Sequence, residues 1–158
     1  MNFLIVLGLY AGIVAVMFYL LGRRFGLAGL SLAAGSLLAD IWALPIAQYL
    51  ASEGVMLEAP PISSIAGIII ILLVGFTVAI KSPKVSGMLA RLVNSLAFSL
   101  LAVAITYEWF RPAVVLDEAS RQYLQILEPH LLSIITGLLI LALVDVIIKH
   151  AKSGKIKK

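Results

Sequence analysis

Asp40 is the residue whose type and position most strongly suggest chemistry. It lies near the middle of the apolar stretch 27–50, where a carboxylate in a membrane-spanning helix costs about 2.5–3.5 kcal/mol to insert. Such a side chain is expected to face the interior of a helix bundle or a water-filled cavity. Asn94 and Ser95, on the apolar stretch 88–110, are polar side chains on another expected helix. We therefore predict an intramembrane polar site, and a candidate ion site, at Asp40, Asn94 and Ser95.

Two roles for Asp40 stay open at this point. In the first, its carboxylate binds a proton or a cation in a small transporter or channel. In the second, it makes a structural hydrogen bond to Asn94, to Ser95 or to a backbone group freed by Pro45, since proline interrupts the hydrogen bonds of a helix. The two roles differ in whether Asp40 faces a water-filled cavity or a neighbouring helix.

The sequence contains no pattern typical of an enzyme or of a metal site. Its two histidines, His130 and His150, are not four residues apart, and it has no cysteine, so the common metal-binding spacings are missing. A glycine loop that cradles phosphate and the nucleophile elbow of hydrolases are also missing. We expect no enzymatic activity, no cofactor and no bound metal.

Asp145 is a second carboxylate in an apolar stretch, and a local explanation is available for it. It precedes Lys149 by four residues, a spacing at which acidic and basic side chains meet on one face of a helix. We therefore predict an ion pair between Asp145 and Lys149, near one membrane surface, and no separate function for either residue.

The elements that carry these residues are predicted to be membrane-spanning helices. The chain is 62% hydrophobic and 13% charged, whereas a soluble domain is about half apolar and about a quarter charged. A helix needs roughly 17–25 residues to cross a bilayer core of about 30 Å. Five apolar stretches are of this length: 3–21, 27–50, 62–80, 88–110 and 131–148. We predict an all-α bundle of five transmembrane helices, forming one domain over 1–148, with a basic cytoplasmic tail over 149–158.

The charges of the loops predict the orientation of these helices. The first loop, the third loop and the tail are basic, and together with Arg91, just inside the helix 88–110, they hold ten of the twelve Lys and Arg residues. The second loop carries Glu53 and Glu58 and no basic residue. Because cytoplasmic loops of membrane proteins are rich in Lys and Arg, we predict an outside N-terminus and a cytoplasmic C-terminus. The predicted location is the plasma or inner membrane, crossed several times.

Three segments have less regular patterns. Residues 116–128 place apolar side chains at helical spacing, which predicts an amphipathic helix on the outer surface that ends at Pro129, with a solvated loop as the alternative. The stretch 27–50 contains Pro45, so we expect the second helix to tilt or to break there. The tail is expected to be disordered, and it serves either to attract anionic lipids or only as a flank that sets topology.

Small residues recur at a spacing of four along the predicted helices, as in membrane helices that approach one another closely. One bundle is not expected to use all of these faces, so we predict a homo-oligomer or a complex with another membrane protein. The lipid bilayer is a further expected partner, whereas nucleic acid is not, because the basic residues flank apolar stretches. The glycines chosen as helix-packing positions are Gly8, Gly12, Gly35, Gly67, Gly75 and Gly137.

The first 110 residues resemble the colicin V production protein family of bacterial inner-membrane proteins. The likeness rests on Arg-Arg-Phe at 23–25, Leu-Ser-Leu at 30–32 and Met-Leu-Ala-Arg-Leu at 88–92. The chain departs from the family pattern at Asn94 and Phe98, where that pattern has glycines, and its fifth apolar stretch lies outside the pattern. The resemblance implies an inner-membrane protein associated with colicin secretion and envelope integrity.

Three functions are consistent with these patterns. The first is a non-enzymatic membrane protein that acts by assembly, as a subunit or accessory factor in envelope or secretion processes. The alternative is a small channel or ion-coupled transporter that uses Asp40. A third is a membrane-permeabilising protein of the phage type, which the small size and basic tail allow.

Overall fold

The chain is described by a computed structural model as a set of long α-helices joined by short connections. The description covers residues 3–55, 57, 60–113 and 118–154, without the side chains of 113, 118–121, 123 and 149–154. Five helices contain a segment long and apolar enough to cross a membrane, which confirms the predicted all-α chain with five such helices. The elements are α1 (Phe3–Leu21), α2 (Phe25–Ser52), α3 (Ile62–Lys81), α4 (Met88–Phe110), the 3-10 turn η1 (Arg111–Ala113) and α5 (Glu118–Gly154).

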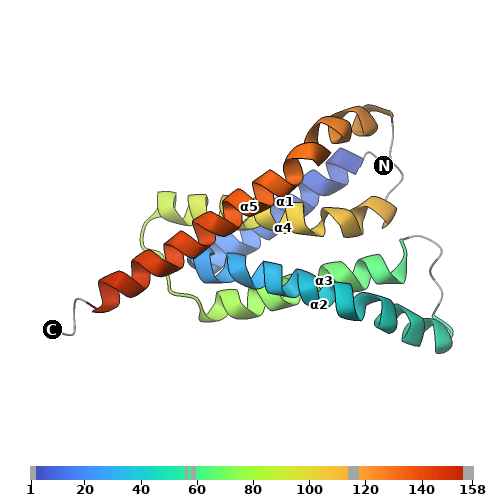
Figure 1. Cartoon of the computed structure of the whole chain (residues 1–158), viewed down its shortest axis with the longest axis horizontal. Coiled ribbons are helices and arrows are strands. Elements are labelled where there is room, and N and C mark those ends of the chain that lie inside the picture. The colour runs from blue at the N-terminus through green and yellow to red at the C-terminus, as the bar shows by residue number, and fades with distance from the viewer. Residues whose placement is uncertain (1–2, 56, 58–59, 114–117, 155–158) are drawn as a thin grey trace.

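The five helices lie side by side, and each runs opposite to the one before it (Figure 1). The connections after α1 and α3 and the C-terminal end of α5 therefore lie at one end of the bundle, on the left of Figure 1. The start of α1 and the ends of α2 and α4 lie at the other end, which we call the far end. We call the first one the basic end, because the chain there carries Arg23, Arg24, Lys81, Lys84 and Arg91.

Glycines allow α2, α3 and α4 to approach closely. A Cβ atom added at Gly35 of α2 would lie 3.0 Å from the Cα atom of Ile71 on α3, so the two backbones are in contact. Gly75 lies beneath the side chain of Leu32, and Gly67 lies beneath the indole of Trp109. A Cβ atom added at Gly8, Gly12 or Gly137 would meet nothing within 4 Å. The six glycines chosen for packing thus divide into three that face neighbouring helices and three that face outward.

Helix α1 packs mainly against α4, through aromatic rings and a hydroxyl group. The rings of Phe18 and Phe98 stack with their centroids 4.1 Å apart, and Phe76 of α3 meets the same Phe98 ring edge-on. The hydroxyl of Ser99 donates a hydrogen bond of 2.7 Å to the carbonyl of Ala11. Offset or edge-on aromatic pairs add to the stabilisation that burial gives, so Phe98 joins α1, α3 and α4 in one core.

Helix α2 is continuous through Pro45, so of the two expected alternatives, a tilt or a break, the break is absent. Its 28 residues make a helix of about 42 Å, which exceeds a hydrocarbon core of about 30 Å. The helix must therefore tilt or project beyond the core. A proline in a membrane helix leaves a carbonyl without its partner and bends the helix locally, but it does not end the helix when both sides remain packed.

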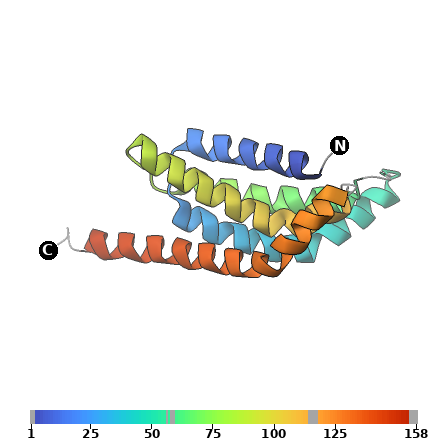
Figure 2. The ribbon, with the colours of Figure 1, turned by 90° about the horizontal axis from the view of Figure 1, so that it is seen from above.

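Helix α5 corrects the prediction of a separate surface helix. It is continuous from Glu118 through Pro129 to Gly154, and Figure 2 shows that its first turns bend away from its long straight part. In those first turns Leu124 is buried, in a cluster with Phe3 and Tyr107. The segment before Pro129 therefore covers the far ends of α1 and α4, and the bend of α5 seen in Figure 2 permits this. Residues 116 and 117 of the predicted surface helix lie outside the described residues.

The predicted disorder of the tail is also corrected in part, because α5 continues as a helix to Gly154. A helix whose last turns carry basic residues is favoured by the negative end of its own dipole. Residues 155–158 lie outside the described part of the chain.

Candidate functional site

A cavity of about 510 Å³ lies between α2, α4 and α5. Four charged residues line it. Asp40 belongs to α2, and Glu108, Arg111 and Glu128 lie at the end of α4, in η1 and in the first part of α5. The cavity therefore lies toward the far end of the bundle. It is lined by Ala33, Ser36 and Asp40 of α2, by Ala104, Ile105, Tyr107, Glu108 and Trp109 of α4, by Arg111 of η1, and by Glu128, Leu131, Leu132, Ile135 and Leu139 of α5.

Glu128 is the one cavity carboxylate that the described residues hold in place. The hydroxyl of Tyr107 donates a hydrogen bond of 2.9 Å to its Oε1 atom. The Nη1 atom of Arg111 lies 3.6 Å from the same oxygen. Tyr107 itself is 1% exposed and meets the ring of Phe3 edge-on. This group of side chains ties the end of α4 to α5, and it neutralises the charge of Glu128.

Asp40 and Glu108 differ from Glu128 in having no such partner. Both side chains are exposed at the cavity, and neither forms a hydrogen bond or ion pair with a residue that the structure describes. The structural role predicted for Asp40, a bond to Asn94, to Ser95 or to a group freed by Pro45, is therefore absent from this arrangement. A charge near the middle of an apolar helix needs water or a counter-ion, and the cavity is where either can reach Asp40.

Asn94 and Ser95 do not line this cavity. Asn94 is in the second turn of α4, at the basic end, and about 21 Å of helix separates it from Glu108. Its Oδ1 atom accepts a hydrogen bond of 2.7 Å from the backbone N–H of Phe25, and its Nδ2 atom donates one of 2.6 Å to the carbonyl of Ala90. The buried Ser95 hydroxyl donates to the carbonyl of Leu92 in its own helix. The structure thus separates these two residues from Asp40.

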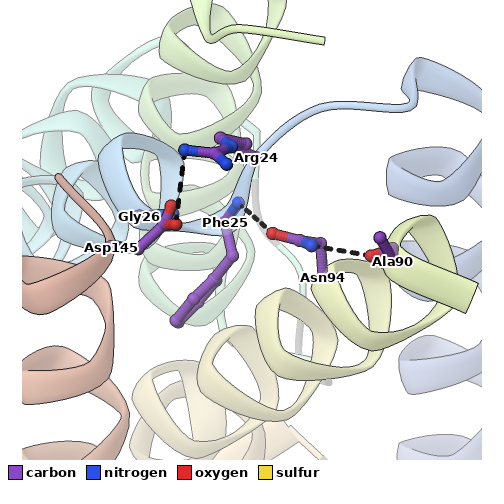
Figure 3. A network of polar contacts seen from close by, with 6 residues as sticks. All are labelled: Arg24, Phe25, Gly26, Ala90, Asn94 and Asp145. Carbon is purple, nitrogen blue, oxygen red and sulfur yellow. Dashed lines mark hydrogen bonds and ion pairs between the residues drawn. The ribbon is translucent and has the colours of Figure 1, made fainter. Parts of the chain in front are cut away.

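Figure 3 shows the contacts that Asn94 makes as part of a polar junction at the start of α2. We use this name for Arg24, Asn94, Asp145 and the backbone N–H groups of Phe25 and Gly26. The N–H of Gly26 donates a hydrogen bond of 3.2 Å to Oδ2 of Asp145. The Nη1 atom of Arg24 lies 3.7 Å from the other oxygen of that carboxylate. Side chains of α4 and α5 therefore supply the N-terminal cap that α2 does not form from its own residues.

The junction gives Asp145 partners that the sequence did not predict, and its predicted pairing with Lys149 stays untested. The partners of Asp145 are Arg24 and Gly26, more than a hundred residues earlier in the chain, and the side chain of Lys149 lies outside the described residues. A carboxylate at the start of a helix is favoured by the free N–H groups and by the positive end of the helix dipole. A Cβ atom added at Gly26 would lie 2.8 Å from the carbonyl oxygen of Ala142, so the glycine is what allows α5 to come this close.

The two connections at the basic end are bonded to each other as well. The N–H of Val85 donates to the carbonyl of Gly22 at 2.9 Å, and the N–H of Arg24 donates to that of Pro83 at 3.0 Å. The guanidinium of Arg23 adds a hydrogen bond of 2.6 Å to the carbonyl of Ser82. Gly22 has a positive φ of 58°, a conformation that favours glycine. The basic end is therefore held together by backbone and side-chain bonds, while the cavity lies toward the far end.

The polar groups of the cavity do not form a metal centre among the described residues. No group of three or more His, Cys, Asp or Glu side chains in that part of the chain is placed to hold a metal ion. The arrangement instead offers two carboxylates that no described residue pairs with, an ion pair between Arg111 and Glu128, and an apolar wall. Such a cavity can bind a positively charged molecule without coordinating it through many ligands.

Comparison of this chain with models of protein families, with curated proteins and with solved structures finds no match. The resemblance of residues 1–110 to the colicin V production protein family stays a prediction from the sequence.

The polar junction predicts how substitutions of Asp145 will affect stability. We expect Asp145→Ala to lower the free energy of unfolding by about 1–2 kcal/mol, because the N–H of Gly26 loses its acceptor. Asp145→Asn should cost less, since the amide oxygen can still accept that hydrogen bond and a half-exposed ion pair contributes only about 0–1 kcal/mol. Thermal unfolding in one detergent measures both. Equal losses for the two variants would show that the ion pair, and not the cap, is the main contribution.

Proposed function

We propose that this chain is a small carrier of the plasma or inner membrane that binds a cation in the cavity, with Asp40 as its intramembrane carboxylate. The observation that supports this most is the position of Asp40, which lines a 510 Å³ cavity with Glu108 and makes no bond to Asn94 or Ser95. In a structural role the Asp40 carboxylate would bond to another part of the protein, whereas in an ion site it is available to bind a cation.

The depth of the cavity favours a carrier over a channel. Along α2 the cavity lining ends at Ala33, and along α5 it ends at Leu139. The polar junction at Gly26 and Asp145 lies beyond these residues, about 10 Å further along each helix. An open channel requires a continuous path, whereas a carrier requires a site that is closed on one side at a time. A cavity that stops short of a bonded junction fits the second description.

The proposed orientation has the basic end in the cytoplasm and the cavity toward the outside. It is supported by the positive-inside rule and by the fact that three basic segments, distant in sequence, gather at one end of the bundle (Figure 1). The N-terminus is then outside and the C-terminus inside.

The orientation is tested with reporters that are active on only one side of a membrane. A reporter fused after residue 158 should be active only in its cytoplasmic form. One inserted between Gly54 and Leu57 should be active only in its external form. Activity of both insertions on the same side would remove the proposed topology.

Ion flux in proteoliposomes tests the role of Asp40. If Asp40 is the binding carboxylate, Asp40→Asn should keep the fold and abolish the flux, because the amide keeps the shape and loses the charge. Asp40→Leu should be equally inactive and at least as stable, since leucine removes the cost of inserting a carboxylate. Glu53→Gln, a change of an exposed carboxylate outside the cavity, is the matched control and should transport as the wild type does.

Two outcomes would argue against this role. Wild-type liposomes without flux under any imposed proton or cation gradient would exclude a carrier. A silent Asp40→Asn together with a destabilised Asp40→Leu would show that Asp40 serves the structure, because leucine would then leave a polar partner unsatisfied at a cost of about 1–3 kcal/mol.

Assembly is the second candidate function, and the outward face of α1 favours it. Gly8 and Gly12 lie in a shallow apolar groove formed by α1 alone, with Leu9, Ile13, Val16 and Met17. Small residues in such a position let a second helix approach closely. A homo-oligomer, or a complex with another membrane protein in envelope or secretion processes, is the form this function takes. The resemblance to the colicin V production family agrees with such a role.

Crosslinking in native membranes tests this candidate. The double change Gly8→Leu and Gly12→Leu should reduce a crosslinked homo-oligomer, because leucine fills the groove that a second helix would use. Gly137→Leu changes an outward glycine of α5 and is the matched control. A particle that is strictly monomeric in mild detergent and in lipid would contradict self-association.

A further inference from the structure

The charged and apolar residues of the cavity are segregated along each helix that lines it. On α5, Glu128 lies at the far end, while Ile135 and Leu139 lie about 10 and 16 Å closer to the basic end. On α2, Asp40 is likewise nearer the far end than Ala33. Helix α4 repeats the pattern, with Glu108 beyond Ile105. The cavity therefore has a charged end, which carries Asp40, Glu108 and Glu128 and which we call its mouth, and an apolar end beside Ile135 and Leu139, which we call its interior.

The size of the cavity also bears on its ligand. About 510 Å³ is far more than the roughly 30 Å³ that one water molecule occupies in the liquid, and it lies within the range of about 300–1,000 Å³ typical of sites for organic molecules. A bare inorganic cation is usually surrounded by six or more oxygen ligands at short distance. The described residues provide no group of acidic or histidine side chains placed for that coordination.

The charge at the mouth selects a cation. Glu128 is engaged by Tyr107 and Arg111, so this pair leaves little net charge. Asp40 and Glu108 remain as the lining carboxylates without a described partner. Trp109 contributes an indole to the same lining, and such rings attract ammonium groups.

We infer that the ligand of this cavity is an amphiphilic organic cation, with an ammonium group at Asp40 and Glu108 and an apolar group in the interior beside Ile135 and Leu139. This inference rests on the proposed carrier function and names the class of molecule that the carrier would bind. An amphiphilic cation is bound both by the attraction between its charge and the carboxylates and by burial of its alkyl group against the apolar wall. A bare inorganic ion is bound by the charge attraction alone.

The tryptophans of the chain provide a direct binding measurement. The sequence has two, Trp42 and Trp109, so the Trp42→Phe variant reports from the cavity alone. In lipid nanodiscs, hexyltrimethylammonium should change the Trp109 fluorescence saturably. It should bind about tenfold or more tightly than tetramethylammonium, because its alkyl chain is buried as well. Hexanesulfonate, which has the same chain and the opposite charge, should give no saturable change.

Variants of the mouth separate binding in the cavity from partition into lipid. In the Trp42→Phe background, Asp40→Asn and Glu108→Gln should each weaken hexyltrimethylammonium binding by about tenfold, which corresponds to about 1.4 kcal/mol. Glu53→Gln should leave it unchanged. Thermal unfolding of each variant checks that the fold is kept.

Four results would overturn the inference. Equal affinity for the two ammonium ions would show that the apolar interior takes no part. Hexyltrimethylammonium binding that Asp40→Asn and Glu108→Gln leave unchanged would show that the ligand lies elsewhere. An Asp40-dependent flux of protons, sodium or potassium, without any effect of either organic cation, would remove the inference and leave the carrier function standing. If no cation of either kind gave an Asp40-dependent response in fluorescence or in flux, both would fall.

Discussion

The first backbone N–H groups of α2 have no carbonyl to bind within their own helix, and this requirement organises the basic end of the bundle. Asn94 of α4 and Asp145 of α5 supply the two acceptors, and neither helix can shift along α2 without losing one of them. The bond between Val85 and the carbonyl of Gly22 then joins the connection after α3 to the one after α1. These few bonds fix the position of α4 and α5 along α2 at the basic end.

The far end is organised by a different kind of contact. There α4 and α5 are joined by the side chains of Tyr107, Arg111 and Glu128, while the side of α2 that carries Asp40 faces open space. The helices α2, α4 and α5 are bonded together at the basic end, but at the far end only α4 and α5 are joined among the described residues. A space is therefore left between α2 and the other two helices. The cavity is thus a consequence of where the polar partners lie, and the tight glycine contact of α2 with α3 keeps α2 from closing it.

The lengths of the apolar stretches were sufficient to predict five helices, because a bilayer core imposes length directly. The partners of individual polar residues were not predictable in this way. The contacts of Asp145 with Arg24 and Gly26 join residues more than a hundred positions apart, and only a three-dimensional arrangement brings those together. The distance between Asn94 and Asp40 could have been predicted from the sequence, because Asn94 lies near the start of its helix and Asp40 lies past the middle of its own. Asn94 caps the start of α2 and Phe98 stacks on Phe18, and neither contact could be predicted from the sequence.

The pairing of α1 with α4 has a consequence for biogenesis. The hydrogen bond from Ser99 to Ala11 joins residues 88 positions apart, and a ribosome adds about 5–20 residues per second, so roughly 4–18 s pass between their synthesis. Helix α3, in contrast, follows α2 directly and can dock on it at once. The nascent chain must therefore hold α1 without its main neighbour until α4 arrives. The α2–α3 hairpin is the first part that can assemble, and α4 is the helix that recruits α1 to it.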